Sequence, residues 1–215
     1  MRSQAIPRLE RVLTRGDFTL DGRSVTVDNN VWLLGDDTEV LVIDAAHDPA
    51  VIAAAVAGRR VNGIVATHGH NDHINAAVEL ADLVDAPIAL HRADHRLWEA
   101  IYPARRPDRA LVDGAQIPVP GGVLHVLHTP GHSPGGVCLF GRFATGPMLF
   151  SGDTLRRGGP GGTGLSFSDL PTLLTSIREK LFSLPSDTVV HPGHGADTTI
   201  GAEALGYDGW VTRGQ

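Results

Sequence analysis

Four side chains that can bind a metal stand within six residues, in the segment T-H-G-H-N-D-H at positions 67–73. His68 and His70 follow an apolar run, and residues i and i+2 of an extended segment point to the same side. Asp72 and His73 fall on the first turn of the helix predicted next. Imidazole and carboxylate groups are ligands that zinc prefers, and iron and manganese accept them too. The segment therefore predicts a metal site rather than isolated packed histidines.

Three further candidate ligands lie in Gly-containing turns along the chain. His132 stands in H-T-P-G-H-S-P-G, Asp153 in S-G-D-T-L and His194 in H-P-G-H-G. An isolated His or Asp in such a turn is ordinarily turn chemistry or a solvated side chain. Each of these follows a predicted strand, however, and the loops at one edge of a sheet can converge. We therefore expect all three to join the first four residues at one site.

The elements that must position these residues are predicted from apolar runs and turn signals. Strands are expected at 25–27, 31–34, 40–43, 64–66 and 88–90, and then at 116–119, 123–127, 136–140, 148–150 and 188–191. Residues 28–30, Asp-Asn-Asn, are expected to form a turn. Helices are expected after Asp48-Pro49, where Asp48 would cap the helix, and at 74–84, 93–101, 168–181 and 200–205. Two strand-rich halves with their own helices predict an α/β fold of two face-to-face sheets with helices outside.

The composition limits the class of protein. The chain has 215 residues, with 18 basic and 24 acidic residues and a formal net charge of −6. This balance argues against nucleic acid as a partner, because phosphate binding needs a basic surface. No stretch is apolar enough for a membrane span, and the first twelve residues lack the apolar core of a signal peptide. A single cysteine excludes a disulfide framework. We expect one domain, residues 1–215, in the cytoplasm, with the oligomeric state left open.

The motif set resembles that of the metallo-β-lactamase fold superfamily, in which H-x-H-x-D-H is followed by single His, Asp and His ligands. Within it, H-T-P-G-H-S-P-G, S-G-D-T-L and P-G-H-G-x-x-T-T-I-G are similar to the glyoxalase II-like hydrolases. The similarity runs from about Asn29 to the last helix. It implies an αββα sandwich, in which two mixed β-sheets pack face to face with helices on the outer faces.

The resemblance also implies a site for two divalent metal ions, zinc in the first instance, with iron or manganese as options. The first ion would be held by His68, His70 and His132. The second ion would be held by Asp72, His73 and His194. Asp153 would bridge both ions together with a hydroxide, and Asp44, at the end of its strand, would orient a ligand.

The chemistry expected of such a site is hydrolysis of an acyl thioester of a low-molecular-weight thiol. The metal-bridging hydroxide would attack the thioester carbonyl, with Asp72 as the catalytic residue that positions the hydroxide or accepts its proton. No serine or cysteine stands in a nucleophile-elbow pattern. The resemblance implies a small-molecule thioester as the partner, and neither nucleic acid nor membrane is expected to be involved.

Departures from the glyoxalase II pattern concern the substrate. Arg156 stands where relatives carry an apolar residue, and we predict that it contacts the substrate. The loop G-G-P-G-x-T-G and the ending G-x-E…Y-x-x-W are similar to actinobacterial hydrolases associated with mycothiol-dependent formaldehyde oxidation. Two alternatives remain open, a persulfide dioxygenase with a single Fe(II) and a lactonase. The roles of four residues also remain open, namely His128, His191, Arg105 and Arg106.

Overall fold

Six strands of the first half form one mixed sheet in sequence order. The structure is a computed structural model that describes residues 7–214; residues 1–6, on which part of the signal-peptide prediction rests, and residue 215 lie outside it. The strands are β1 (Arg8–Leu20), β2 (Arg23–Gly35), β3 (Glu39–Ile43), β4 (Arg60–Val65), β5 (Ile88–His91) and β6 (Arg109–Leu111). The first three pair antiparallel, and β3 to β6 pair parallel.

The second half forms the other six-stranded sheet, in the order β14-β13-β10-β9-β8-β7. Its strands are β7 (Gln116–Val119), β8 (Gly122–His128), β9 (Val137–Phe143), β10 (Gly146–Gly152), β13 (Val189–Pro192) and β14 (Thr198–Thr199). Strands β10 and β13 run parallel, so their carboxyl ends lie at the same edge. A small ribbon of β11 (Leu155–Arg156) and β12 (Gly159–Pro160) follows β10.

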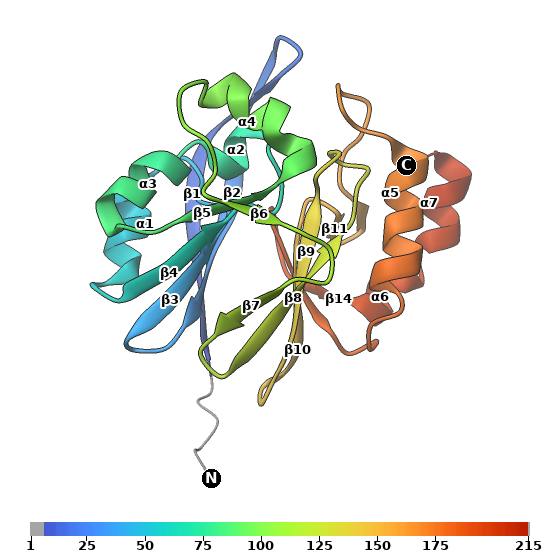
Figure 1. Cartoon of the computed structure of the whole chain (residues 1–215). Helices are drawn as coiled ribbons and strands as arrows, with labels where there is room; N and C mark the ends of the chain where they lie inside the picture. The colour runs from blue at the N-terminus through green and yellow to red at the C-terminus, as the bar shows by residue number, and fades with distance from the viewer. Residues whose placement is uncertain (1–6, 215) are drawn as a thin grey trace.

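Helices cover the outer face of each sheet (Figure 1). On the first sheet lie α1 (Pro49–Val56), α2 (Asn71–Ile74), α3 (Ala77–Val84) and α4 (His95–Ile101), the last preceded by a 3₁₀ turn at Arg92–Asp94. On the second lie α5 (Leu170–Ser176), which continues as a π-helical turn over Ile177–Leu181, then α6 (Ile200–Ala204) and α7 (Tyr207–Arg213). The chain is therefore an αββα sandwich, as the sequence predicts.

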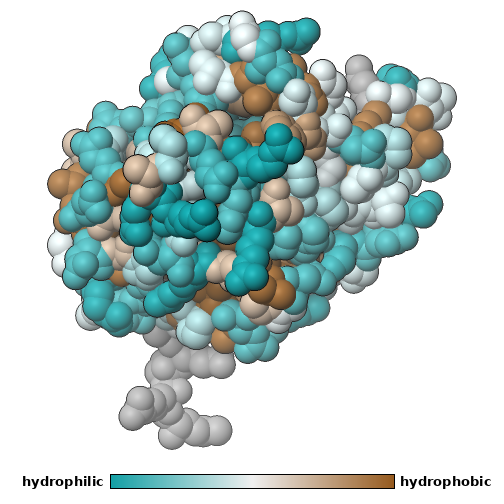
Figure 2. Space-filling view, turned by 45° about the horizontal axis from the view of Figure 1, so that its top comes forward, coloured by the Kyte–Doolittle hydropathy of each residue, from teal (hydrophilic) through white to brown (hydrophobic). Residues whose placement is uncertain are grey.

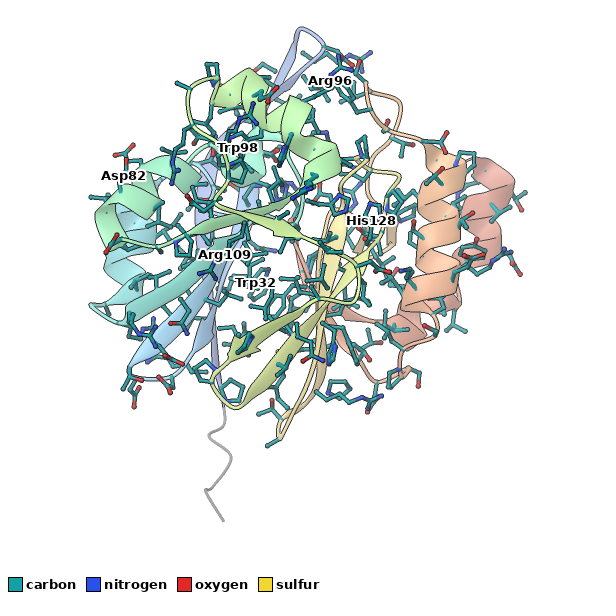
Figure 3. All side chains as sticks on the ribbon, viewed as in Figure 1. Trp32, Asp82, Arg96, Trp98, Arg109 and His128 are labelled. Carbon is teal, nitrogen blue, oxygen red and sulfur yellow. The ribbon has the colours of Figure 1, made fainter. Side chains whose placement is uncertain are left out.

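Three clusters of buried apolar side chains lie between the four layers of helices and sheets and hold them together. Between the sheets, Trp32 packs edge-on against Phe150 with ring centroids 6.1 Å apart, and Figure 3 shows Trp32 in this position. A second cluster joins the first sheet to its helices, and a third joins the second sheet to α5, α6 and α7. Side chains 31–34 of β2 alternate between the first two clusters, so this part of the strand is buried on both faces, whereas its first residues are exposed.

The prediction of a turn at residues 28–30 is wrong. Strand β2 runs unbroken from Arg23 to Gly35, and β1, which the apolar pattern did not indicate, pairs with it along its whole length. The helix predicted to start at Ser168 begins at Leu170, because Asp169 accepts the hydrogen bond of Thr172 N at 2.8 Å and caps it. The predicted cap at Asp48 is confirmed, with Val51 N donating to its carboxylate at 3.0 Å.

The face turned to the viewer in Figure 2 is mainly hydrophilic, and its apolar residues form small separate patches. Among residues 7–214, none of the helices combines the length and the apolar character needed to cross a bilayer.

Candidate metal centre

All seven predicted ligands meet at one edge of the two sheets. His68 and His70 follow β4, and Asp72 and His73 lie on α2. The loop from β8 to β9 carries His132. Asp153 follows β10 and His194 follows β13, and because these two strands are parallel neighbours their ends bring both residues to the same place.

The first group joins three imidazoles. His70 Nδ1 lies 3.1 Å from His68 Nε2 and 3.0 Å from His132 Nε2. All three side chains are buried. Their ligand atoms are close enough to share one metal ion.

The second group joins a carboxylate and two imidazoles. His73 Nε2 and His194 Nε2 lie 3.2 Å apart. Asp72 Oδ2 lies 3.6 Å from His73 Nε2 and 3.3 Å from His194 Nε2. These atoms form a second possible metal site.

Asp153 stands between the two groups. Its Oδ2 is 3.6 Å from His132 Nε2 in the first group and 3.4 Å from His194 Nε2 in the second. Its Oδ1 is 3.5 Å from His73 Nε2. Gly193 must lack a side chain here, because a Cβ would lie 2.5 Å from His73 Cε1 and 2.7 Å from Asp153 Oδ1. Asp153 therefore lies within 3.6 Å of imidazole nitrogens from both groups.

The outward nitrogens of three imidazoles are held by fixed acceptors. His132 Nδ1 donates to the Gly162 carbonyl at 2.7 Å, and His194 Nδ1 donates to the Asp28 carbonyl at 2.8 Å. His73 Nδ1 faces Asp44 Oδ2 at 3.0 Å. With the proton on the outer nitrogen, the inner nitrogen of each ring can give its lone pair to a cation at the centre whenever the ring is neutral.

Asp44 acts through its neighbours. The residue has a left-handed φ of 58° and is 1% exposed. Its Oδ1 accepts from Thr67 N at 2.7 Å, and its Oδ2 accepts from Thr67 Oγ1 at 2.8 Å besides facing His73. Asp44 therefore holds the His73 ring and the backbone directly before His68.

Two asparagines of β2 brace the centre, and no sequence pattern indicates this role. Asn29 Nδ2 donates to Asp72 O at 2.8 Å and to Asp72 Oδ2 at 3.2 Å. Asn30 Nδ2 donates to the carbonyls of Pro192 and Gly195, both at 2.9 Å, which holds the His194 loop. Both side chains are buried within the strand. The Asp-Asn-Asn segment resembles a turn in the sequence. Its role is revealed only by the folded structure, which places Asn29 beside Asp72 and Asn30 beside the loop of His194.

Asp94 is the other supporting residue that sequence patterns did not reveal. It is fully buried, and it accepts from Gly69 N at 2.8 Å, from Ser133 Oγ at 2.7 Å and from Gly135 N at 2.5 Å. Gly69 lies between His68 and His70, and the other two donors follow His132. A single carboxylate thus joins the two loops that carry the first group.

The histidines of the two groups differ in the direction of their pKa shifts. Burial, followed by the neighbouring imidazoles, lowers the pKa of His68 well below its usual range and lowers the pKa of His70 to about 3. Burial also disfavours charge on His73, but the carboxylates of Asp72, Asp153 and Asp44 outweigh it and raise the pKa of His73 to about 10. The first group is therefore neutral, and the second lies in a negative field that favours a cation.

The donor set fits divalent cations. In the first group His70 Nδ1 lies 3.1 Å from His68 Nε2 and 3.0 Å from His132 Nε2, so one cation could accept a lone pair from each of the three imidazoles. In the second group, carboxylates surround His73 so closely that a positive charge is favoured at its ring. Asp72 Oδ1 is buried without a hydrogen-bond partner in the described part of the chain. Imidazole and carboxylate ligands suit zinc, iron and manganese alike.

A cavity of about 420 Å³ opens over the centre. His70, Asp72, His132, Asp153 and His194 reach it, and apolar side chains form part of its wall, namely Phe18, Val27 and Leu165. Arg156 lines its rim, so the structure brings this predicted substrate contact to the centre.

The residues whose roles the sequence left open lie away from the cavity. Arg105 pairs with Asp108 at 3.0 Å, and neither Arg105 nor Arg106 lines the cavity. His191 packs against Trp32 with ring centroids 4.8 Å apart. His128 stacks on His91 with centroids 4.1 Å apart.

The fold and the paired donor groups define a metallo-β-lactamase-type centre. Residues 25–194 match the family model described as the Metallo-beta-lactamase superfamily, and the chain belongs to this family. Among curated relatives, the Probable metallo-hydrolase YqgX of Bacillus subtilis is 33% identical over 186 residues, covering 80% of this chain and 87% of its own. Hydroxyacylglutathione hydrolase GloC of Haemophilus influenzae is 34% identical over 153 residues, covering 65% of this chain and 71% of its own.

Solved structures agree with this placement. TTHA1623 in a di-iron-bound form is 35% identical with a TM-score of 0.73, covering 83% of this chain and 93% of its own. The BLEG-1 B3 metallo-beta-lactamase is 29% identical, also with a TM-score of 0.73, covering 88% of this chain and 95% of its own. Family and relatives together support a metal-dependent hydrolase.

Proposed function

We propose that this protein is a dinuclear metal hydrolase that cleaves an acyl thioester of a low-molecular-weight thiol. One observation carries the proposal: Asp153 lies between two complete donor groups at the floor of an open cavity. Two divalent ions held there would acidify a water and polarise a carbonyl, which is the chemistry that hydrolysis of an ester or thioester needs. The name of GloC, a hydroxyacylglutathione hydrolase, supports a thioester as the substrate.

The side chains of the cavity have separate parts in this reaction. Asp72 is held as an anion, because His73, His194 and Asn29 outweigh burial and lower its pKa well below the usual range. Its unpartnered Oδ1 orients the attacking water, so that Asp72 is the catalytic carboxylate. Phe18, whose ring lies 5.5 Å from that of His70, and Leu165 form an apolar wall that suits a small acyl group.

Zinc is the metal we propose. Each of the two donor groups would hold one ion, which gives two ions per chain. The di-iron form of TTHA1623 makes iron the natural comparison. Metal content is measured on protein purified without a tag and after loading with each metal in turn.

The test of reaction class uses one acyl group on several thiols, including the small uncharged thiol N-acetylcysteamine, and follows thiol release. Oxygen uptake is recorded in parallel with a persulfide as substrate. We expect two ions per chain, thiol release and no oxygen uptake. A single iron per chain with oxygen uptake and no thiol release would transfer the assignment to a persulfide dioxygenase. Cleavage of lactones but of no thioester would make the protein a lactonase.

A further inference from the structure

A second cavity, of about 690 Å³, adjoins the cavity over the metal centre. Its walls come from the β11–β12 ribbon, from the loop after His194 and from the end of α7. Four residues line both cavities, namely Arg156, Gly162, Thr163 and His194. The two cavities are therefore neighbours, and a ligand whose reactive group lies at the metal centre would have the second cavity beside it.

Among residues 7–214, three arginines and no acidic side chain line the second cavity, although the whole chain has a net charge of −6. Arg156 and Arg213 make no ion pair within residues 7–214, unlike Arg59 or Arg105. Arg157 differs, because its guanidinium donates to the carbonyl of Asp197. The cavity thus concentrates positive charge: within residues 7–214 none of the three guanidinium groups pairs with a carboxylate, and only that of Arg157 is held by a carbonyl.

The β11–β12 ribbon that carries Arg156 is held in place by Glu203 and Trp210. Glu203 is 5% exposed and accepts from Gly158 N at 2.9 Å and from Thr198 Oγ1 at 2.6 Å. Trp210 of α7 is also buried, and its indole lies beside Gly159, where a Cβ would be 3.4 Å from Nε1. The ribbon and α7 are therefore packed together, which holds Arg156 and Arg213 on the walls of one cavity.

We propose that this cavity binds an anionic group of the thiol carrier, a carboxylate or a phosphate, through Arg156 and Arg213. The inference rests on the proposed function, because it assigns the half of the thioester that leaves as the thiol. A guanidinium pairs with either anion through two parallel hydrogen bonds. Glutathione carries carboxylates and coenzyme A carries phosphates. Mycothiol, which the sequence resemblance suggested, is a sugar thiol without an ionised group and gives these arginines nothing to pair with.

The test compares acetyl thioesters of glutathione, of coenzyme A and of uncharged N-acetylcysteamine, on wild type and on the variants R156Q, R213Q and the double variant. R178Q is the matched control, because Arg178 is exposed on the π-helical turn and lines neither cavity. We expect KM for the anionic carrier to rise about ten-fold in each single variant with kcat little changed. The uncharged thioester should respond to none of the substitutions.

A binding measurement separates this inference from the proposed function. S-methylglutathione and S-methyl coenzyme A cannot be hydrolysed as thioesters, and their affinity for metal-free protein is measured by calorimetry. Tighter binding of one of them identifies carboxylate or phosphate as the anion, and R156Q should weaken it about ten-fold. Equal kcat/KM for charged and uncharged carriers in wild type, or binding unchanged in the double variant, would overturn the inference while leaving thioester hydrolysis intact. Binding that depends on the arginines, without hydrolysis of any thioester, would instead refute the function.

Discussion

Asp94→Ala is the substitution whose cost follows most directly from the structure. The fully buried carboxylate accepts hydrogen bonds from Gly69 N, Ser133 Oγ and Gly135 N at 2.8, 2.7 and 2.5 Å. Alanine leaves three buried donors without an acceptor, and each such donor costs about 1–3 kcal/mol. Burial raises the pKa of Asp94 despite these donors, which means that the folded state is destabilised by the buried charge. Removing the carboxylate therefore relieves this desolvation penalty and offsets part of the loss.

With this offset included, the free energy of unfolding is expected to fall by about 3–5 kcal/mol. For a chain of this length, such a loss lowers the melting temperature by roughly 10 °C. The measurement is thermal unfolding of metal-free protein, because bound metal stabilises the folded state by itself. Asp82→Ala is the control, since Asp82 is exposed on α3, as Figure 3 shows, and its loss should change little.

The same variant should also weaken the first metal group, because Asp94 joins the loops on either side of it. Competition with a chelator measures this affinity, and we expect a loss of about 10–100-fold. The melting temperature and metal affinity of Asp94→Asn should lie between those of wild type and Asp94→Ala. The side-chain oxygen of asparagine can still accept a hydrogen bond, whereas its NH2 group would face a donor. A metal-free Asp94→Ala protein that melts with wild type would refute the hydrogen-bond reasoning.

Three further predictions concern other parts of the molecule. Asp153→Ala should lose activity and at least one metal ion per chain, because Asp153 faces both groups; a fully loaded, active variant would sink the dinuclear proposal. Asp44→Ala should lower metal affinity about 10–100-fold by freeing the His73 ring, and chelator competition equal to wild type would contradict this. Burial and then His128 lower the pKa of His91 from 6.5, so protonation favours the unfolded state and stability is lost as pH falls below 6.5. His91→Gln should therefore flatten the decline of unfolding free energy between about pH 7 and pH 5, and an unchanged slope would exclude His91 as its source.

The candidate metal ligands could be proposed from the sequence because their signal is local. His68, His70, Asp72 and His73 lie within six residues, and the remaining three each follow an apolar strand in a Gly-containing turn. Ligand chemistry belongs to the side chain itself, and strand ends can be recognised from short apolar runs. The same local logic predicted the cap at Asp48 and the two-sheet sandwich.

Local patterns misled where a distant partner decides the structure. The Asp-Asn-Asn segment has turn chemistry, yet pairing with β1 keeps it extended and Asn29 bonds to a residue 43 positions away. Strand β1 alternates only partly buried residues, so its pattern is weak without the partner strand. Propensity is a weak preference that a full ladder of backbone hydrogen bonds outweighs.

What the sequence alone determined is therefore the kind of chemistry, through residue types and their spacing along short segments. The tertiary structure decided which groups support it. Asn30 reaches Gly195 across 165 positions, Asp94 joins loops 25 and 41 positions away, and the end of α7 brings Arg213 to the cavity of Arg156. Such contacts leave no periodic trace, because they depend on how whole sheets and helices pack, and a buried polar group finds its partner only once that packing exists.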